Sequence, residues 1–163
     1  MTISTSGLVP EILKLSKELK TELAISLHSA DEENRTEIMA INKKYPLSEL
    51  MKACKIYNQE NEKRKITFEY VMLNGVNDSE KDALDLVKLI NKYNLNVKVN
   101  LIPFNPWESC DFVNSENNKI VDFKEILRKN SIIATIRKTR GQDAMAACGQ
   151  LKSESLRQKK KQR

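Results

Sequence analysis

Predicted strands and helices alternate along nearly the whole chain, and this alternation constrains the fold more than any other feature. Strands are predicted where apolar and polar residues alternate, or where β-branched and aromatic residues gather. Helices are predicted where apolar residues recur at every third or fourth position. The predicted strands are 2–6, 23–28, 66–73, 97–104 and 132–138, and the predicted helices are 8–20, 29–40, one from 47, 79–93 and 118–129. Strands and helices in this order pair in parallel through right-handed crossovers, so the predicted fold class is α/β.

The starts of two of these helices carry capping signals. Ser29 and Glu32 have the spacing of a capping box, which predicts that the helix begins there. Asp78 or Ser79 is the predicted cap of the helix that runs to about Tyr93.

The two faces of the predicted strands differ in polarity. Leu23, Ile25 and Leu27 alternate with the polar residues Ser26 and His28, and the later strands follow the same pattern. A parallel sheet covered by helices on both faces would be apolar throughout. We therefore predict helices on one face and a polar concavity on the other, as in a barrel wall. A closed eight-stranded barrel takes about 250 residues, so five strands form only part of one.

Length and cysteine usage narrow the class of protein. A chain of 163 residues, 40% of them hydrophobic, is large enough for one core. The three cysteines are odd in number and far apart, which disfavours a disulfide framework and favours a reducing compartment. No apolar run approaches the ~20 residues of a membrane span, and the N-terminus lacks a signal-peptide core. These features predict a cytoplasmic protein without a membrane partner.

The net charge of +6 is concentrated at the end of the chain. Residues 152–163 hold six Lys or Arg and one Glu, which leaves residues 1–151 close to neutral. We predict one domain over 1–151 and a basic, disordered tail over 152–163. The tail either contacts phosphate non-specifically or is a solvated terminus, and both interpretations stay open.

His28 is the only histidine, and it stands at the carboxyl end of a predicted strand, where β/α walls gather their active sites. A structural, hydrogen-bonded histidine is the more common explanation for such a residue. One histidine and scattered cysteines offer no zinc site. The sequence also lacks a G-x-S-x-G elbow and a glycine-rich phosphate loop.

The three cysteines lie in different surroundings. Cys54 falls on the apolar stripe of a helix and is predicted to be a core residue. Cys110 is in a polar loop and receives no role. Cys148 lies in the small-residue segment 144–149, after the basic segment Arg137–Gly141. Cations folded against it would stabilise its thiolate, so a reactive thiol and an inert one both remain open.

Six ordered motifs cover the chain up to its basic tail. They are STSG (Ser4–Gly7), AISLH (Ala24–His28), INKKY (Ile41–Tyr45), EYVML with VND (Glu69–Leu73, Val76–Asp78), NLIPFNP (Asn100–Pro106), and RKTRG with D and AACGQL (Arg137–Gly141, Asp143, Ala146–Leu151). Together they resemble the RlmN family, radical S-adenosylmethionine (SAM) enzymes that methylate C2 of adenosine in 23S rRNA and tRNA. The resemblance implies the C-terminal portion of a partial (β/α)6 radical-SAM barrel.

The resemblance also implies roles for individual residues. S-adenosylmethionine would be held by Ser4, Ser26, Leu27, His28 and Asn105. RNA phosphate would be contacted by Arg137, Lys138 and Arg140, although a solvated strand end explains these residues nearly as well.

Cys148 matches the cysteine that becomes S-methylcysteine in the family. Adenine C2 is an unactivated carbon, so a methyl group cannot simply be displaced onto it. In the family, the methyl thioether is converted to a radical by the 5′-deoxyadenosyl radical, adds to the ring, and is resolved by a second thiol.

Several parts of the family's machinery are absent from the sequence. These are the C-x-x-x-C-x-x-C motif for the [4Fe-4S] cluster, a Gly-Glu pair, the general-base glutamate, the second catalytic cysteine and the N-terminal RNA-binding domain. We therefore expect no catalysis by this polypeptide alone. A split, truncated or mis-started gene is predicted, and only in the split case is the N-terminal half on a separate chain. Two alternatives stay open. One is a non-catalytic product that binds RNA weakly through its tail, and the other is an unrelated thiol enzyme that uses Cys148 and His28.

Overall fold

The computed structural model describes residues 1–18 and 20–138, which form a five-stranded sheet with the strands in chain order. Every neighbouring pair of strands is parallel. The strands are β1 (Thr2–Thr5), β2 (Glu22–Ser26), β3 (Ile66–Met72), β4 (Val97–Pro103) and β5 (Ile133–Ile136). The helices are α1 (Val9–Glu18), α2 (Glu32–Ile38), the short 3-10 helix η1 (Ala40–Lys43), α3 (Leu47–Glu60), α4 (Glu80–Lys92) and α5 (Asn117–Lys129). The predicted α/β fold with five parallel strands is confirmed.

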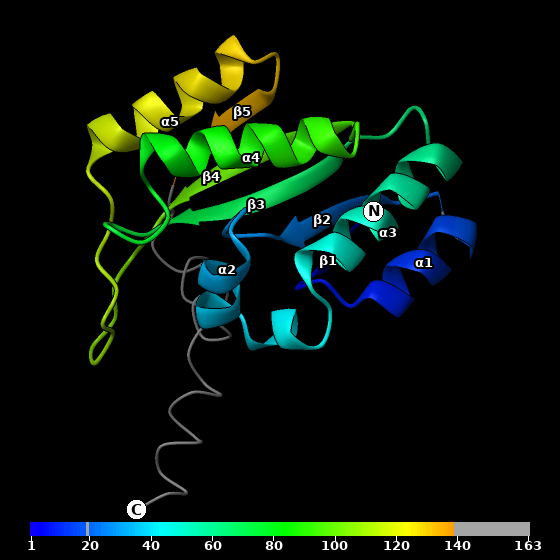
Figure 1. Ribbon diagram of the computed structural model, residues 1–163, viewed down its shortest axis with the longest axis horizontal. Helices are drawn as coiled ribbons and strands as arrows, with labels where there is room; N and C mark the ends of the chain where they lie inside the picture. The colour runs from blue at the N-terminus through cyan, green and yellow to red at the C-terminus, as the bar shows by residue number, and fades with distance from the viewer. Residues whose placement is uncertain (19, 139–163) are drawn as a thin grey trace, which may run out of the picture.

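One face of the sheet carries the main helices. Figure 1 shows α1, α3, α4 and α5 on the same side, and the main hydrophobic core lies between them and the strands. Ile25, Phe68 and Val99 lie in register across β2, β3 and β4 and are buried in this core. Full burial of an apolar side chain of this size contributes about 1.5–3 kcal/mol. The predicted placement of helices on one face of the sheet is therefore confirmed, as is the burial of Cys54.

The opposite face, here called the open face, is polar along most of its length but apolar at its carboxyl end. Val71 and Ile102 are paired in register there and are buried. They belong to a second apolar cluster with Ile38, Met39 and Phe104, against which Trp107 and Phe112 pack. The second cluster thus covers the carboxyl end of the face for which the sequence predicts a polar concavity.

Helix α2 begins later than the sequence predicts. Its N-cap is Asp31, whose side chain accepts a hydrogen bond from the backbone N–H of Asn34 at 2.9 Å. The Ser29 hydroxyl instead accepts from the N–H of Asp31 at 3.1 Å, and the Glu32 carboxylate accepts from the N–H of Leu47. The predicted capping box of Ser29 and Glu32 is therefore wrong, because both side chains have other partners. A capping box does form at Ser79 and Asp82, where a cap was predicted.

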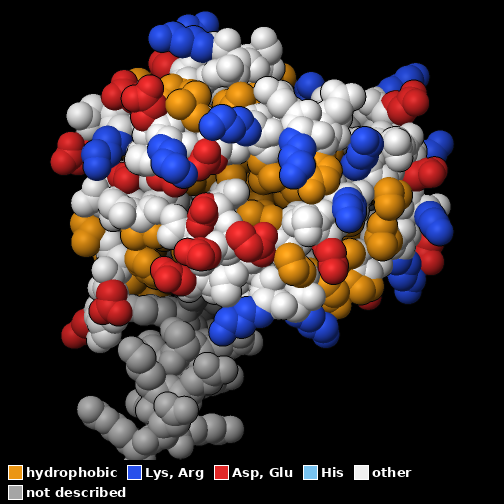
Figure 2. Space-filling view, in the orientation of Figure 1, with side chains coloured by type: hydrophobic (Ala, Val, Ile, Leu, Met, Phe, Trp, Pro, Cys, Tyr) orange, Lys and Arg blue, Asp and Glu red, His pale blue; other side chains and the backbone are white. Residues whose placement is uncertain are grey.

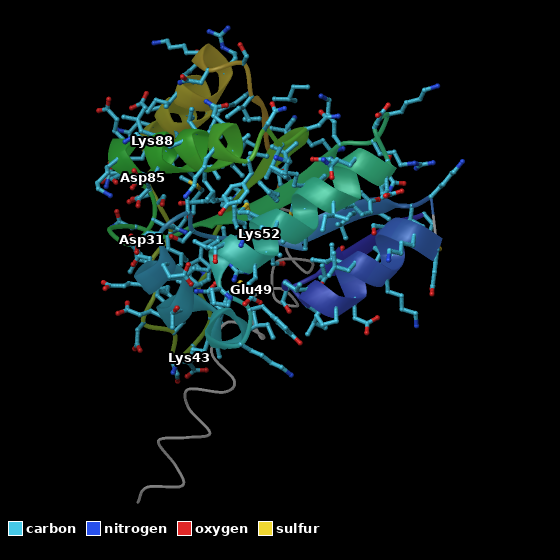
Figure 3. All side chains as sticks on the ribbon, turned by 45° about the vertical axis from the view of Figure 1, so that its right-hand side comes forward. Asp31, Lys43, Glu49, Lys52, Asp85 and Lys88 are labelled. Carbon is cyan, nitrogen blue, oxygen red and sulfur yellow. The ribbon has the colours of Figure 1, made fainter. Side chains whose placement is uncertain are left out.

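Charges of both signs are mixed over the helix-covered side. Figure 2 shows Lys, Arg, Asp and Glu side chains interspersed on this face, as expected for a nearly neutral domain. Lys52 on α3 and Lys88 on α4 are two of the exposed cations there (Figure 3). Among the described residues, no helix is long and apolar enough to cross a membrane.

Candidate functional site

A row of polar side chains crosses the open face. Ser26, Glu69, Asn100 and Thr135 are paired in register on β2 to β5. The Thr135 hydroxyl donates a hydrogen bond to Oδ1 of Asn100 at 3.3 Å. None of the four side chains is buried, so the row offers hydroxyl, carboxylate and amide groups to a ligand on this face.

The structure brings together only part of the predicted set of cofactor residues. Ser26, Leu27 and His28 follow one another at the carboxyl end of β2, and Asn105 is exposed just after β4. Ser4 is exposed on β1 in register with Ala24, and therefore lies on the same face as Ser26. The carboxyl ends of parallel strands meet at one edge, which is where ligands of β/α walls bind.

His28, which is predicted to share one face with Ser4 and Ser26, lies beyond the end of the strand and is buried. Strand β2 ends before it, its backbone has φ 60°, and its side chain is only 2% exposed. Its Nδ1 accepts a hydrogen bond from the N–H of Val71 at 3.1 Å. Burial, together with the charge of Arg35, lowers the pKa of His28 to about 3. The imidazole is therefore neutral near pH 7, with its proton on Nε2.

Asn77 fixes the backbone around this histidine. Its Nδ2 donates to the carbonyls of His28 and Val71, both at 2.7 Å, and its Oδ1 accepts from the N–H of Leu73 at 2.8 Å. Its own carbonyl accepts from the Tyr70 hydroxyl at 2.7 Å. The ends of β2 and β3 are thereby joined through one buried side chain. Asn77 lies in the VND motif, but its sequence pattern does not predict this role.

Arg35 joins the ends of β1 and β2 in a similar way, and the sequence analysis missed it. Its Nε donates to the carbonyl of Leu27 at 3.0 Å, and its Nη2 donates to those of Ser6 and Ser26 at 2.9 and 3.2 Å. Its Nη1 donates to Oδ1 of Asn42 at 2.7 Å. Burial lowers the pKa of Arg35 to about 10, against the opposing effect of Glu32, so the group stays charged near pH 7.

The backbone conformation of Gly7 and the closeness of Arg35 explain why the STSG motif ends in glycine. Its φ is 113°, a conformation that L side chains rarely adopt, and a Cβ added there would lie 3.2 Å from Nη2 of Arg35. Glycine at this position lets the guanidinium reach the end of β1.

The described cysteines do not suit an iron–sulfur cluster. Cys54 is fully buried in the main core, and burial raises the pKa of its thiol to about 12. Cys110 packs against the second apolar cluster, away from Cys54. Within residues 1–18 and 20–138, no group of three or more His, Cys, Asp or Glu side chains could hold a metal ion.

The remaining predicted residues follow β5. The backbone N–H of Arg137 donates to the carbonyl of Leu101 at 2.8 Å, and the side chain of Lys138 is exposed. Arg140, Cys148 and the tail 152–163 lie outside the described residues.

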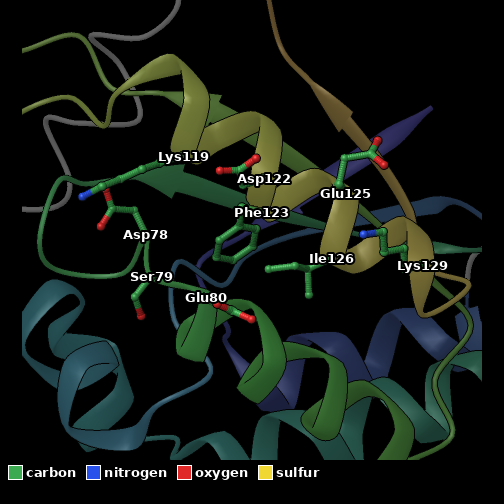
Figure 4. Close-up of a pocket in the computed structure, with 9 residues that line it drawn as sticks. All are labelled: Asp78, Ser79, Glu80, Lys119, Asp122, Phe123, Glu125, Ile126 and Lys129. Atoms are coloured by element: carbon green, nitrogen blue, oxygen red, sulfur yellow. The ribbon is translucent and has the colours of Figure 1, made fainter.

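A separate hollow of about 420 Å³ lies between α4 and α5 (Figure 4). Asp78 and Lys119 approach each other at its rim, with Nζ and Oδ2 3.7 Å apart, and Phe123 contributes to its lining. It contains none of the predicted site residues.

Comparison with known proteins decides the family. Residues 1–104, well over half of the chain, match the radical SAM superfamily. The chain belongs to the radical SAM superfamily. A crystal structure of a radical SAM methyltransferase from Sphaerobacter thermophilus superimposes with a TM-score of 0.84 and 44% identity, over 93% of this chain and 44% of that one. A domain of pyruvate-formate lyase-activating enzyme from Bacteroides vulgatus, at 15% identity and a TM-score of 0.64, shares the radical SAM fold.

The curated relatives that this chain matches belong to one family within the radical SAM superfamily. The dual-specificity RNA methyltransferase RlmN of Zymomonas mobilis is 51% identical over 99% of this chain and 41% of its own length. RlmN of Gluconobacter oxydans is 50% identical over 98% of this chain and 39% of its own length. The resemblance to the RlmN family is confirmed, and the chain spans about two-fifths of the length of these relatives.

Proposed function

We propose that this chain forms the part of a radical SAM RNA methyltransferase that holds S-adenosylmethionine and carries a methyl group to C2 of adenosine in 23S rRNA and tRNA. The main support is identity of about one half to RlmN proteins along nearly the whole chain. Such substrates imply action in the cytoplasm.

The edge of the sheet where the carboxyl ends of the strands meet, here called the carboxyl edge, offers polar groups that can bind S-adenosylmethionine. S-adenosylmethionine presents an ammonium group, a carboxylate and ribose hydroxyls, which need hydrogen-bonding partners in fixed positions. Ser4 and Ser26 offer hydroxyls on the open face, and Asn105 offers an amide after β4. Leu27 and His28 are buried, so their contribution is a backbone held in place by Arg35 and Asn77. In this proposal His28 is a positioning residue rather than an acid or base.

Cys148 is proposed to carry the methyl group as a thioether before its transfer to the adenine ring. The resemblance assigns this role, and the chemistry supports it, because an unactivated aromatic carbon requires a carrier that can bond to it transiently. Arg137, Lys138 and Arg140 would contact RNA phosphate beside this cysteine.

The [4Fe-4S] cluster that the superfamily uses to cleave S-adenosylmethionine does not fit the described residues, because their two cysteines lie in different apolar clusters. We propose that a separate segment with the C-x-x-x-C-x-x-C motif supplies it and that this chain alone is inactive.

Methyl transfer is expected to require both Cys148 and the cluster-binding segment. The chain would be co-expressed with the part of Zymomonas mobilis RlmN that it does not match, and 2-methyladenosine in tRNA and 23S rRNA would be measured by mass spectrometry. We expect product from this pair, and none from the chain alone or from a Cys148→Ala variant.

The Cys110→Ala variant is the matched control, because Cys110 lies outside the main core and has no proposed role. It should retain methyl transfer. Product from the Cys148→Ala pair, or no product from the unaltered pair, would contradict the proposed function.

A further inference from the structure

A basic hollow of about 450 Å³ lies at the edge of the sheet opposite to the proposed cofactor site. Lys63, Arg64 and Lys65 line it from the loop between α3 and β3, and Lys98 lines it from the second position of β4. Glu22, at the start of β2, is its only acidic lining residue, and its carboxylate accepts a hydrogen bond from the Thr2 hydroxyl. The hollow therefore carries an excess of positive charge.

The four cations of this hollow outnumber its one lining carboxylate, that of Glu22. Within the part of the chain that the structure describes, none of the four makes an ion pair, whereas Lys81, Lys119 and Arg128 do. Like charges held this close repel one another, and an anion in the hollow would relieve that repulsion.

The loop that carries these cations is held in place by asparagines. Nδ2 of Asn58 donates to the carbonyls of Arg64 and Asn96 at 3.4 and 3.2 Å, and Oδ1 of Asn58 accepts from the N–H of Asn96 at 2.9 Å. Nζ of Lys65 donates to Oδ1 of Asn96 at 2.9 Å. The fold thus holds the backbone of this loop at Arg64 and the ammonium group of Lys65.

We propose that this hollow binds the phosphodiester backbone of RNA, at a site distant from the nucleotide that is modified. Its cations come from a loop and from a neighbouring strand, and several cations side by side suit the successive phosphates of a nucleic acid. The choice of RNA rests on the proposed function.

The hollow and the carboxyl edge lie at opposite ends of the strands. Strand β4 has seven residues, which at ~3.3 Å each places the two edges roughly 20 Å apart. A folded RNA is long enough to contact both. Phosphate contacts fix the register and orientation of a nucleic acid without reading its sequence, so the hollow would orient the substrate and leave its selection to other residues.

The test is binding of a fluorescently labelled tRNA transcript to the full 163-residue chain, followed by anisotropy over a range of salt concentrations. In one variant Lys63, Arg64 and Lys98 are replaced by glutamine, and Lys65 is kept because it bonds to Asn96. In the control Lys14, Lys52 and Lys88 are replaced by glutamine, which removes the same charge from the exposed surface of α1, α3 and α4.

The hollow variant should bind at least tenfold more weakly than the control at low salt. Each lost phosphate contact lowers the slope of log affinity against log salt by about 0.7–0.9, so we expect a slope shallower by about 2. If the triple variant fails to fold, Lys63→Gln with Lys98→Gln changes exposed residues only and should lower the slope by more than one unit.

Equal binding by the hollow variant and the control would overturn this inference, and so would the absence of any tRNA binding by the unaltered chain. Production of 2-methyladenosine by the co-expressed pair is a separate measurement. Equal binding together with methyl transfer would reject the hollow and leave the proposed function standing.

Discussion

Replacing Arg35 with leucine is expected to lower the free energy of unfolding by about 3–5 kcal/mol. The side chain is fully buried, and it donates to three backbone carbonyls and to the Asn42 amide oxygen. Leucine fills part of the volume but removes all of these donors. The bonds to the Leu27 carbonyl and to Asn42 Oδ1 are buried, and each buried acceptor left without a donor costs about 1–3 kcal/mol. Urea denaturation followed by circular dichroism measures the change.

Two further variants serve as controls. One tests whether the charge of Arg35 is enough without its donor geometry, and the other measures the cost of losing an exposed arginine. Arg35→Lys keeps the charge but not the planar fork of donors, so it should recover only part of the loss. Arg128→Leu removes an exposed arginine that pairs with Glu125, and its cost should stay below about 1 kcal/mol. A loss for Arg35→Leu no greater than that for Arg128→Leu would contradict the proposed support of the strand ends.

Acidification is expected to destabilise the fold through His28. The pKa of His28 is about 3 in the folded chain, against an ordinary value of 6.5. Between these values the unfolded chain binds a proton that the folded chain does not. The stability that the neutral imidazole provides is therefore complete above pH 6.5 and is lost as the pH falls toward 3. The slope attributable to this one group is at most about 1.4 kcal/mol per pH unit.

A His28→Asn variant isolates this contribution from the carboxylates that also titrate in acid. Asparagine tolerates a positive φ and can accept the hydrogen bond from Val71, but it does not bind a proton in this range. Unfolding free energies from urea titrations between pH 7 and 4.5 should fall more steeply for the unaltered chain than for the variant. Parallel curves would show that His28 is not held neutral by the fold.

The fold was predictable because its signals are local. The alternation of Leu23, Ile25 and Leu27 with polar neighbours identified both the strand and the face that the helices cover, and the apolar stripe containing Cys54 identified a buried helix face. Each signal spans only one strand or one helix, and the parallel direction and order of the strands then follow from the right-handed crossovers.

The site was predictable only in part, because its supports come from distant segments. Arg35 lies in the charged segment EENRTE and resembles a solvated residue, since its partners are backbone carbonyls that leave no pattern in the sequence. The cap of α2 was misplaced because Ser29 and Asp31 are both good caps within three positions. His28 follows the strand alternation in sequence, yet it lies beyond the end of β2 with a positive φ and is buried. The roles of Ser4, Asn105 and Cys148 in the chemistry stay predictions.

The second apolar cluster also gives the chain an optical probe at a useful place. Trp107 is the only tryptophan in the sequence, and its ring packs edge-on against Phe104 with 5.7 Å between the ring centres. Asn105, a proposed cofactor ligand, lies between these two residues in the chain. Intrinsic fluorescence excited at the indole band therefore comes from the carboxyl edge alone, so its intensity and wavelength report occupancy there without any attached dye.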